Sequence, residues 1–125
     1  MKHLPSIDAT DIANAVSMRA AIGALREAFA THPAHIARSA YPAAGGDLLV
    51  MPAVDDRAAG IKLLMVQPRN VDRGEPVIQG TYVLFDADAG APVALLDGAA
   101  LTSLRTPAVS AVATCLLYTS DAADE

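Results

Sequence analysis

Two isolated basic side chains are the residues of this sequence best placed to do chemistry. Lys62 interrupts the apolar run 61–66, and Arg105 follows the largely apolar stretch 93–104, with no sequence neighbour to neutralise either charge. A short run rich in branched residues predicts a strand inside the core, where an unpaired ammonium costs several kcal/mol. We therefore expect an anionic group, such as the carboxylate of a substrate, to meet Lys62.

Lys62 has two interpretations at this stage. Burial lowers the pKa of an ammonium and a nearby carboxylate restores its charge, so a buried lysine can bind an acid or move a proton. Alternatively, Lys62 lies on an edge strand, with its stem along the sheet and its head in water.

Arg105 is a further candidate for holding an anion. If a helix begins at 105–107, its free N–H groups and its dipole would favour an anion beside the Arg105 guanidinium. The alternative for Arg105 is a solvated arginine on a helix. Arg38, which precedes the pair Met51-Pro52 in the sequence, is interpreted from the residues alone as a surface arginine on a strand.

Composition limits the class of protein. With 125 residues the chain forms one domain at most, and a hydrophobic share of 53% is enough for a core. The formal net charge is -5 and the nine basic residues are scattered, so no face is suited to binding nucleic acid.

Targeting and metal signals are absent from the sequence. No apolar segment reaches the roughly 20 residues that span a bilayer, and the N-terminus lacks the apolar region of a signal peptide, so we expect no membrane partner and a cytoplasmic location. The single cysteine, Cys115, excludes an internal disulfide. The histidines at 3, 32 and 35 lack a metal-ligand pattern, so we expect no metal site.

Hydrophobic periodicity predicts the elements. Ser17 can cap a helix to about residue 30, with an apolar stripe of Met18, Ile22, Leu25 and Phe29, and residues 8–15 can form a helical turn before it. Period-two patterns predict strands at 34–41, 47–52, 59–67, 77–86 and 92–96, with a polar loop at 68–76 and a hairpin turn at 86–90.

A second helix follows the strands. Asp97 can cap it through Leu104, and Thr106-Pro107 either restarts or kinks it. Consecutive strands with short turns predict an α+β fold, with a mainly antiparallel sheet and helices on one face. Gly45-Gly46 lacks the third glycine and the helix start of a dinucleotide fingerprint.

Several short motifs resemble one known family. IKL at 61–63, GTYVLFD at 80–86, ALLDG at 94–98 and LRT at 104–106 occur in the order and spacing of the ornithine cyclodeaminase and mu-crystallin family. The resemblance runs from about Ile7 to Thr114. It implies that 1–114 is the substrate-binding and dimerisation domain of a homodimer, and that a Rossmann domain binding NAD or NADP follows beyond this sequence.

The resemblance also implies roles for individual residues. Lys62 would hold the substrate carboxylate and assist at the reacting carbon. Arg38 and Arg105 would bind the same carboxylate, and Thr106 would lie near the dinucleotide phosphates. Two positions depart from the family pattern: Val77 stands where some relatives have threonine, and Pro107 where alanine is expected.

The family implies an NAD(P)-dependent enzyme acting on a small amino or imino acid. Its activity would be cyclisation of ornithine to proline with release of ammonia, or reduction of a cyclic imino acid. A mu-crystallin-like binding protein is one alternative. Another is an inactive fragment, because relatives supply a catalytic aspartate from the half that is missing here.

The end of the sequence has a separate interpretation. Residues 115–125 resemble one reading frame of a sequencing adapter translated into protein, and the alanine-rich helical pattern before them changes abruptly. We therefore expect 115–125 to be non-native and the native frame to continue after Thr114. A helix that frays into an acidic tail is the alternative.

Overall fold

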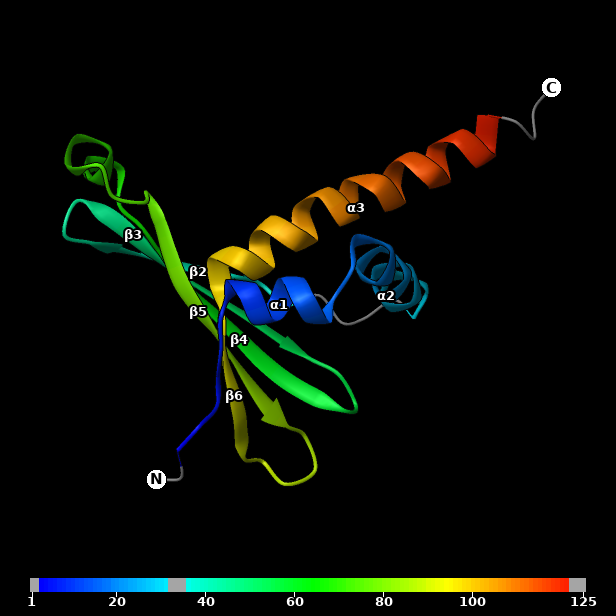
Figure 1. Cartoon of the computed structure of the whole chain (residues 1–125), viewed down its shortest axis with the longest axis horizontal. Helices are drawn as coiled ribbons and strands as arrows, with labels where there is room; N and C mark the ends of the chain where they lie inside the picture. Colours follow the sequence, from blue (N-terminus) through cyan, green and yellow to red (C-terminus); the bar gives the residue numbers. More distant parts are fainter. Residues whose placement is uncertain (1–2, 32–35, 122–125) are drawn as a thin grey trace.

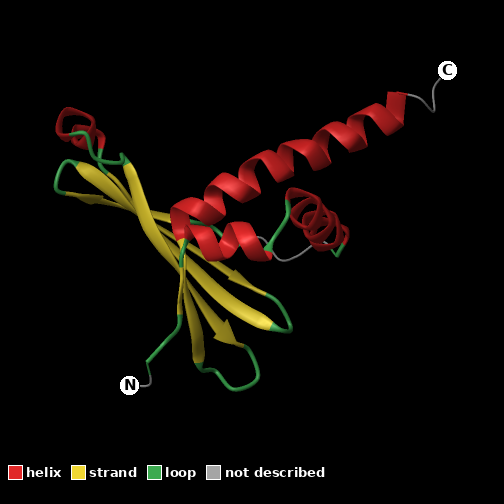
Figure 2. Cartoon of the chain, in the orientation of Figure 1, coloured by secondary structure: helices red, strands yellow, loops and turns green. Residues whose placement is uncertain are grey.

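The computed structural model of the chain describes residues 3–31 and 36–121 as one layer of sheet beneath one layer of helices (Figures 1 and 2). The strands are β1 (Ser6–Ile7), β2 (Ser39–Ala43), β3 (Gly46–Val54), β4 (Ala58–Val66), β5 (Ile78–Asp86) and β6 (Pro92–Asp97). The α-helices are α1 (Ala9–Ala15), α2 (Met18–Ala30) and α3 (Gly98–Asp121), and η1 (Pro68–Arg73) is a 3-10 helix.

The six strands form one sheet in the order β1-β6-β5-β4-β3-β2. β2 to β6 each pair antiparallel with their neighbours in the sequence, and β1 joins the edge of the sheet in parallel with β6. The predicted α+β class, with a mainly antiparallel sheet and helices on one face, is confirmed. No helix within 3–31 or 36–121 has the length and apolar character needed to cross a membrane.

Side-chain caps start the helices where the sequence predicts. Asp8 accepts hydrogen bonds from the N–H groups of Thr10 and Asp11, and Ser17 accepts one from Ala20. Asp97 accepts from Ala99 and Ala100, both at 2.9 Å, so α3 begins directly after β6. Such caps satisfy backbone donors that the first helical turn leaves unpaired.

The turns also follow local sequence chemistry. Gly45 and Gly90 have positive φ values of 84° and 63°, in the hairpins β2–β3 and β5–β6. Asp86 supports the second hairpin by accepting from the N–H groups of Asp88 and Ala89. The hairpin predicted at 86–90 is confirmed.

Alternation along the strands gives the sheet two different faces. On β4, Gly60, Lys62 and Leu64 are buried beneath the helices, and the residues between them are half-buried on the other face. The buried apolar core is small and is shared by α1, the sheet and α3; its members are Ile12, Leu64, Ala94, Ala108 and Val112.

Several sequence predictions need correction. The strand expected at 34–41 begins only at Ser39 and runs to Ala43, and 32–35 lie outside the described residues. The two-residue strand β1 was not predicted, because so short a parallel pairing has no sequence period. The loop expected at 68–76 contains η1, which ends at Gly74 with a φ of 68°.

Helix α3 differs most from the prediction. It is continuous from Gly98 to Asp121 with Pro107 inside it, so no helix restarts at Thr106. Proline lacks the N–H that would bond the carbonyl four residues earlier, at Ser103. The stripe predicted on α2 is only partly covered, because Met18 and Phe29 are 42% and 47% exposed.

A close backbone approach fixes the start of α3 on the sheet. A Cβ atom added at Gly98 would lie 3.0 Å from the backbone of Gly80 on β5. A Cβ added at Gly80 would collide with the carbonyl oxygen of Leu63 and the side chain of Leu64. Glycine at these two positions lets the helix and two strands meet closely, which sets the height of α3 above β4.

We predict that Gly80→Ala lowers the free energy of unfolding by about 1–3 kcal/mol, because the new methyl group overpacks against backbone atoms. Gly23→Ala is the matched control: it lies inside α2 with no atom within 4 Å of an added Cβ, and alanine there should add about 0.5–1 kcal/mol. Urea denaturation followed by circular dichroism measures both. Equal effects in the two variants would contradict the packing argument.

Candidate functional site

Lys62 lies in the middle of the sheet. β4 has β3 on one side and β5 on the other, so the edge-strand interpretation is wrong. The residue is 8% exposed. A lysine this buried is unusual unless a partner meets its charge.

The Lys62 head group contacts helix α3. Its Nζ donates to Oγ1 of Thr102 at 3.3 Å, and the Thr102 hydroxyl donates to the carbonyl of Gly98 at 2.7 Å. The threonine therefore uses its proton on the helix backbone and offers a lone pair to the ammonium. Among the described residues, no carboxylate forms an ion pair with Lys62. The hydrogen bond to Thr102 therefore holds the ammonium in place, but its charge is not neutralised.

The pKa of Lys62 is lowered from its ordinary value of 10.5, mainly by burial and additionally by the positive charge of Arg105. Both causes disfavour the ammonium form. A bound anion would act in the opposite direction. The arrangement thus has a built-in preference for a negatively charged ligand.

A cavity of about 520 Å³ lies between the sheet and the helices beside Lys62. Helices α2 and α3 contribute apolar side chains such as Leu25, Leu101 and Leu104. Within the described chain, the polar side chains that line it are Lys62, Tyr82 and Arg105, and no acidic residue does so. A small acid with an apolar remainder matches this chemistry.

The register of the sheet explains which side chains share the cavity. Met51, Lys62, Tyr82 and Leu96 pair across β3, β4, β5 and β6 as one row. Paired residues of neighbouring strands point to the same face. The row therefore presents all four side chains to the helices.

Arg105 lies in α3, seven residues after its first residue, so the helix-terminus argument made for it is wrong. Free backbone N–H groups occur only in the first turn of a helix. The residue is largely exposed, yet it lines the cavity and its charge acts on Lys62. Any anion binding by Arg105 rests on the guanidinium itself.

Arg38 and Thr106 are not in the cavity lining. Arg38 is exposed and lies just before β2, where one further step of the register would place it opposite Met51. Two strand spacings separate that row position from Lys62, about 10 Å. Thr106 is exposed on α3, and its carbonyl accepts from the Ser110 hydroxyl at 3.2 Å.

The departure at Val77 lies away from Lys62. Val77, Gln79 and Thr81 line a separate hollow on the face of the sheet that the helices leave open. The hydroxyl of Thr81 donates to the carbonyl of Leu96 at 3.1 Å. A hydroxyl missing at 77 therefore leaves the lining of the Lys62 cavity unchanged.

Sequence reasoning missed Thr102 and Tyr82. Thr102 precedes Arg105 by three residues, a spacing that puts both on one helix face, and this signal was available. Tyr82 was visible only as a member of a strand, because its position opposite Lys62 depends on register.

The described residues do not include a complete dinucleotide site. The Gly45-Gly46 pair forms the β2–β3 hairpin turn, instead of the strand-to-helix turn that cradles a pyrophosphate. Groups of three or more potential metal-binding side chains are also absent from the described chain. Among the described residues, the cavity beside Lys62 therefore lacks the elements that would hold NAD(P).

The fold and the cavity define an α+β domain in which a buried lysine and an arginine line one apolar cavity. The sequence profile of the ornithine cyclodeaminase/mu-crystallin family matches residues 6–124, and the chain belongs to that family. The Δ1-pyrroline-2-carboxylate reductase of Bacillus thuringiensis subsp. konkukian is 37% identical over 116 residues, which cover 86% of this chain and 36% of that protein.

Solved structures agree with the family assignment. The Thermococcus litoralis Δ1-pyrroline-2-carboxylate reductase in complex with NADH and L-proline superposes with a TM-score of 0.80 at 29% identity, covering 89% of this chain and 37% of that one. An archaeal alanine dehydrogenase dimer with bound NAD gives 0.77 at 30% identity, covering 85% and 34%. The chain spans 21–38% of the length of the curated relatives it matches.

We predict that Lys62→Met raises the free energy of unfolding at neutral pH, because methionine keeps the stem and removes a charge that folding buries. The folded pKa of Lys62 lies below 10.5, so the unfolded chain binds more protons between the two values and wild-type stability rises with pH there. The advantage of Lys62→Met should therefore shrink as pH approaches 10.5. Urea denaturation from pH 7 to 10.5 measures it.

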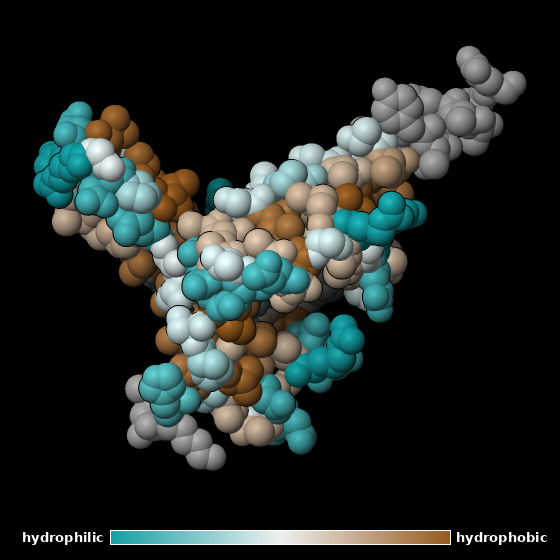
Figure 3. Space-filling model, in the orientation of Figure 1, coloured by the Kyte–Doolittle hydropathy of each residue, from teal (hydrophilic) through white to brown (hydrophobic). Residues whose placement is uncertain are grey.

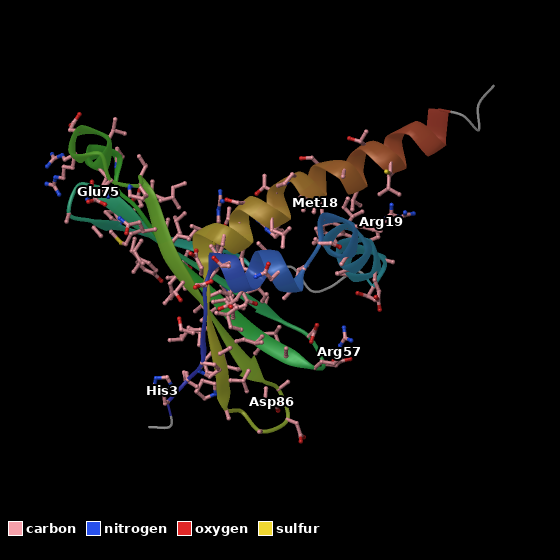
Figure 4. The ribbon with its side chains drawn as sticks, viewed as in Figure 1. His3, Met18, Arg19, Arg57, Glu75 and Asp86 are labelled. Atoms are coloured by element: carbon pink, nitrogen blue, oxygen red, sulfur yellow. The ribbon has the colours of Figure 1, made fainter. Side chains whose placement is uncertain are left out.

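The control for this prediction is Arg19→Met, which removes a charge from an exposed position on α2 (Figure 4). Its effect on stability should stay small at every pH. A Lys62→Met variant less stable than wild type at pH 7 would contradict the prediction.

Proposed function

We propose that this chain is the substrate-binding part of an NAD(P)-dependent enzyme that acts at the α-carbon of a small amino or imino acid. The reaction would be cyclisation of ornithine to proline and ammonia, or reduction of a cyclic imino acid. The observation that carries the proposal is the pair of cations, Lys62 and Arg105, facing one apolar cavity without an acidic partner in its described lining.

The substrate carboxylate would lie between these cations. Lys62 Nζ offers donors beyond the one used on Thr102, and Arg105 can bind two oxygens through its guanidinium fork. An anion there would offset the mutual repulsion of the cations. Arg38 is exposed next to the Met51 end of the row that contains Lys62. It would bind the substrate carboxylate from the edge of the cavity.

Lys62 can also carry a proton. Reducing an imine adds a hydride to carbon and a proton to nitrogen, and Lys62 is the cavity residue whose lowered pKa brings proton release closer to neutral pH. Burial under α3 keeps water from competing for that proton. The same residue would therefore serve as anchor and proton carrier.

The hydride itself would come from a nicotinamide dinucleotide, which the T. litoralis reductase binds as NADH together with L-proline. The described residues lack the cradle for it, so we propose that a further part of the protein supplies the cofactor site, with Thr106 near the phosphates. We propose in addition that 1–114 forms the native domain and that 115–125 is non-native.

A homodimer is proposed from the open face of the sheet. The alternation on β4 puts the apolar side chains of Ile61, Leu63 and Met65 on the side of the sheet away from the helices, and hydrophobic atoms are visible along the sheet in Figure 3. Apolar faces of this extent favour association. The related archaeal alanine dehydrogenase is a dimer.

We predict that Lys62→Ala and Arg105→Ala each weaken binding of L-proline by about 10–100-fold, because each removes a charged hydrogen bond to the carboxylate. Isothermal titration calorimetry on the full-length protein, loaded with NADH, measures the affinity. Arg19→Ala, an exposed arginine on α2 that points away from the sheet (Figure 4), is the matched control and should bind as wild type does. Undiminished binding in Lys62→Ala would refute the carboxylate-anchor proposal.

We predict further that Leu63→Glu shifts the protein from dimer to monomer, because a carboxylate on the open face cannot be buried against a second copy. Sedimentation velocity measures the mass, and circular dichroism checks that the variant is folded. Thr10→Glu adds the same charge on exposed helix α1 and should leave the dimer intact. A monomeric wild type would refute the dimer proposal.

A further inference from the structure

Tyr82 occupies a part of the cavity that the carboxylate anchor leaves unused. It pairs with Lys62 across β4 and β5, so both side chains point toward the helices. A Cβ atom added at Gly60 would collide with the hydroxyl and ring of Tyr82. The ring therefore lies over Gly60, two residues before Lys62 on β4. The Tyr82 hydroxyl is thus beside Gly60, whereas Lys62 Nζ contacts Thr102 on α3.

The Tyr82 ring is positioned by packing and not by a hydrogen bond of its hydroxyl. No hydrogen bond among the described residues involves its hydroxyl. Burial raises its pKa, and the charge of Asp55 raises it further, so the group stays a neutral phenol. Neighbouring lining residues from the sheet, including Met51, Leu84 and Leu96, are apolar. A ligand anchored at Lys62 would thus have its remainder against a ring and aliphatic side chains.

Charge decides which remainder fits. The terminal ammonium of ornithine would add a further positive charge to a cavity that already holds Lys62 and Arg105, with no acidic residue in its described lining. It would lose water and gain no ionic partner from the described residues of this domain. An uncharged aliphatic or cyclic remainder avoids both costs and buries apolar surface instead.

Asp55 is an acidic group whose charge acts on Tyr82 and that could change this balance. It lies in the β3–β4 turn, is fully exposed, and uses one oxygen to accept from the N–H groups of Arg57 and Ala58, both at 2.8 Å. Solvent screens a carboxylate in that position. Asp55 lies outside the cavity lining and is therefore a weak partner for an ammonium inside it.

We propose that Tyr82, seated over Gly60, determines specificity in this cavity, and that the acid it selects is a monocarboxylic amino or imino acid with an apolar remainder rather than a diamino acid. The inference rests on the proposed function, because it assumes that the carboxylate lies at Lys62 and Arg105. It goes further by assigning the rest of the substrate to the ring of Tyr82.

The test compares ligands that differ by one group. L-norvaline has the straight side chain of L-ornithine without its terminal ammonium. In the full-length protein loaded with NADH, calorimetry should give an affinity for L-norvaline about tenfold or more above that for L-ornithine. L-proline should behave like L-norvaline. Equal or tighter binding of L-ornithine would overturn the inference.

Variants then connect the selectivity to Tyr82. Tyr82→Ala removes the ring and admits water, so the norvaline-to-ornithine affinity ratio should fall toward one, while Tyr82→Phe keeps the ring and should keep the ratio. Tyr41→Ala, an exposed tyrosine on β2, is the matched control. A merely structural role would weaken both ligands equally and leave the ratio unchanged in Tyr82→Ala, which would overturn the assignment.

Two more variants separate the possible failures. Asp55→Asn should leave the ratio of the L-norvaline and L-ornithine affinities unchanged. A selective loss of L-ornithine binding would show that Asp55 binds the terminal ammonium and would overturn the inference. Lys62→Ala tests the underlying proposal, because it should weaken all three acids together. Suppose that Lys62→Ala loses affinity for all three acids but the wild type binds L-norvaline no more tightly than L-ornithine. That result would refute the inference and leave the proposed function standing.

Discussion

The burial of one ammonium in a central strand is the constraint on which the rest of the site depends. Lys62 can occupy β4 only because α3 begins close enough to the sheet for Thr102 to accept a hydrogen bond from Nζ. That closeness depends in turn on glycine at positions 80 and 98, where helix and strand backbones nearly touch. The contact between β4, β5 and α3 thus fixes both where the Lys62 ammonium lies and which group accepts its hydrogen bond.

The buried core is small, and for this reason a cavity remains between the helices and the sheet. Few side chains are fully buried, and α2 covers the sheet with only part of its apolar stripe. Space therefore remains between the helices and the row that contains Lys62 and Tyr82. The energetic cost of a buried, unneutralised lysine is a typical compromise at a binding site, where a ligand supplies the missing charge.

Two faces of one sheet carry two different roles in this interpretation. The face beneath the helices carries Lys62 and forms one wall of the cavity, and the open face presents apolar side chains. Because side chains alternate along each strand, the neighbouring residues Lys62 and Leu63 lie on opposite faces and would serve the two proposed roles separately. A one-residue shift in register would exchange the two sets, so the pairing of β4 is under strong constraint.

The sequence by itself determined the local elements and the class of fold. Caps at Asp8, Ser17 and Asp97, the β5–β6 hairpin and the five longer strands follow from short-range chemistry, and the family motifs singled out Lys62 and Arg105. Only the tertiary structure decided that Lys62 is central rather than at an edge, that α3 continues through Pro107, and that Thr102 and Tyr82 join the site. These facts depend on strand order, register and helix packing, which join residues far apart in the chain and leave no local periodic signal.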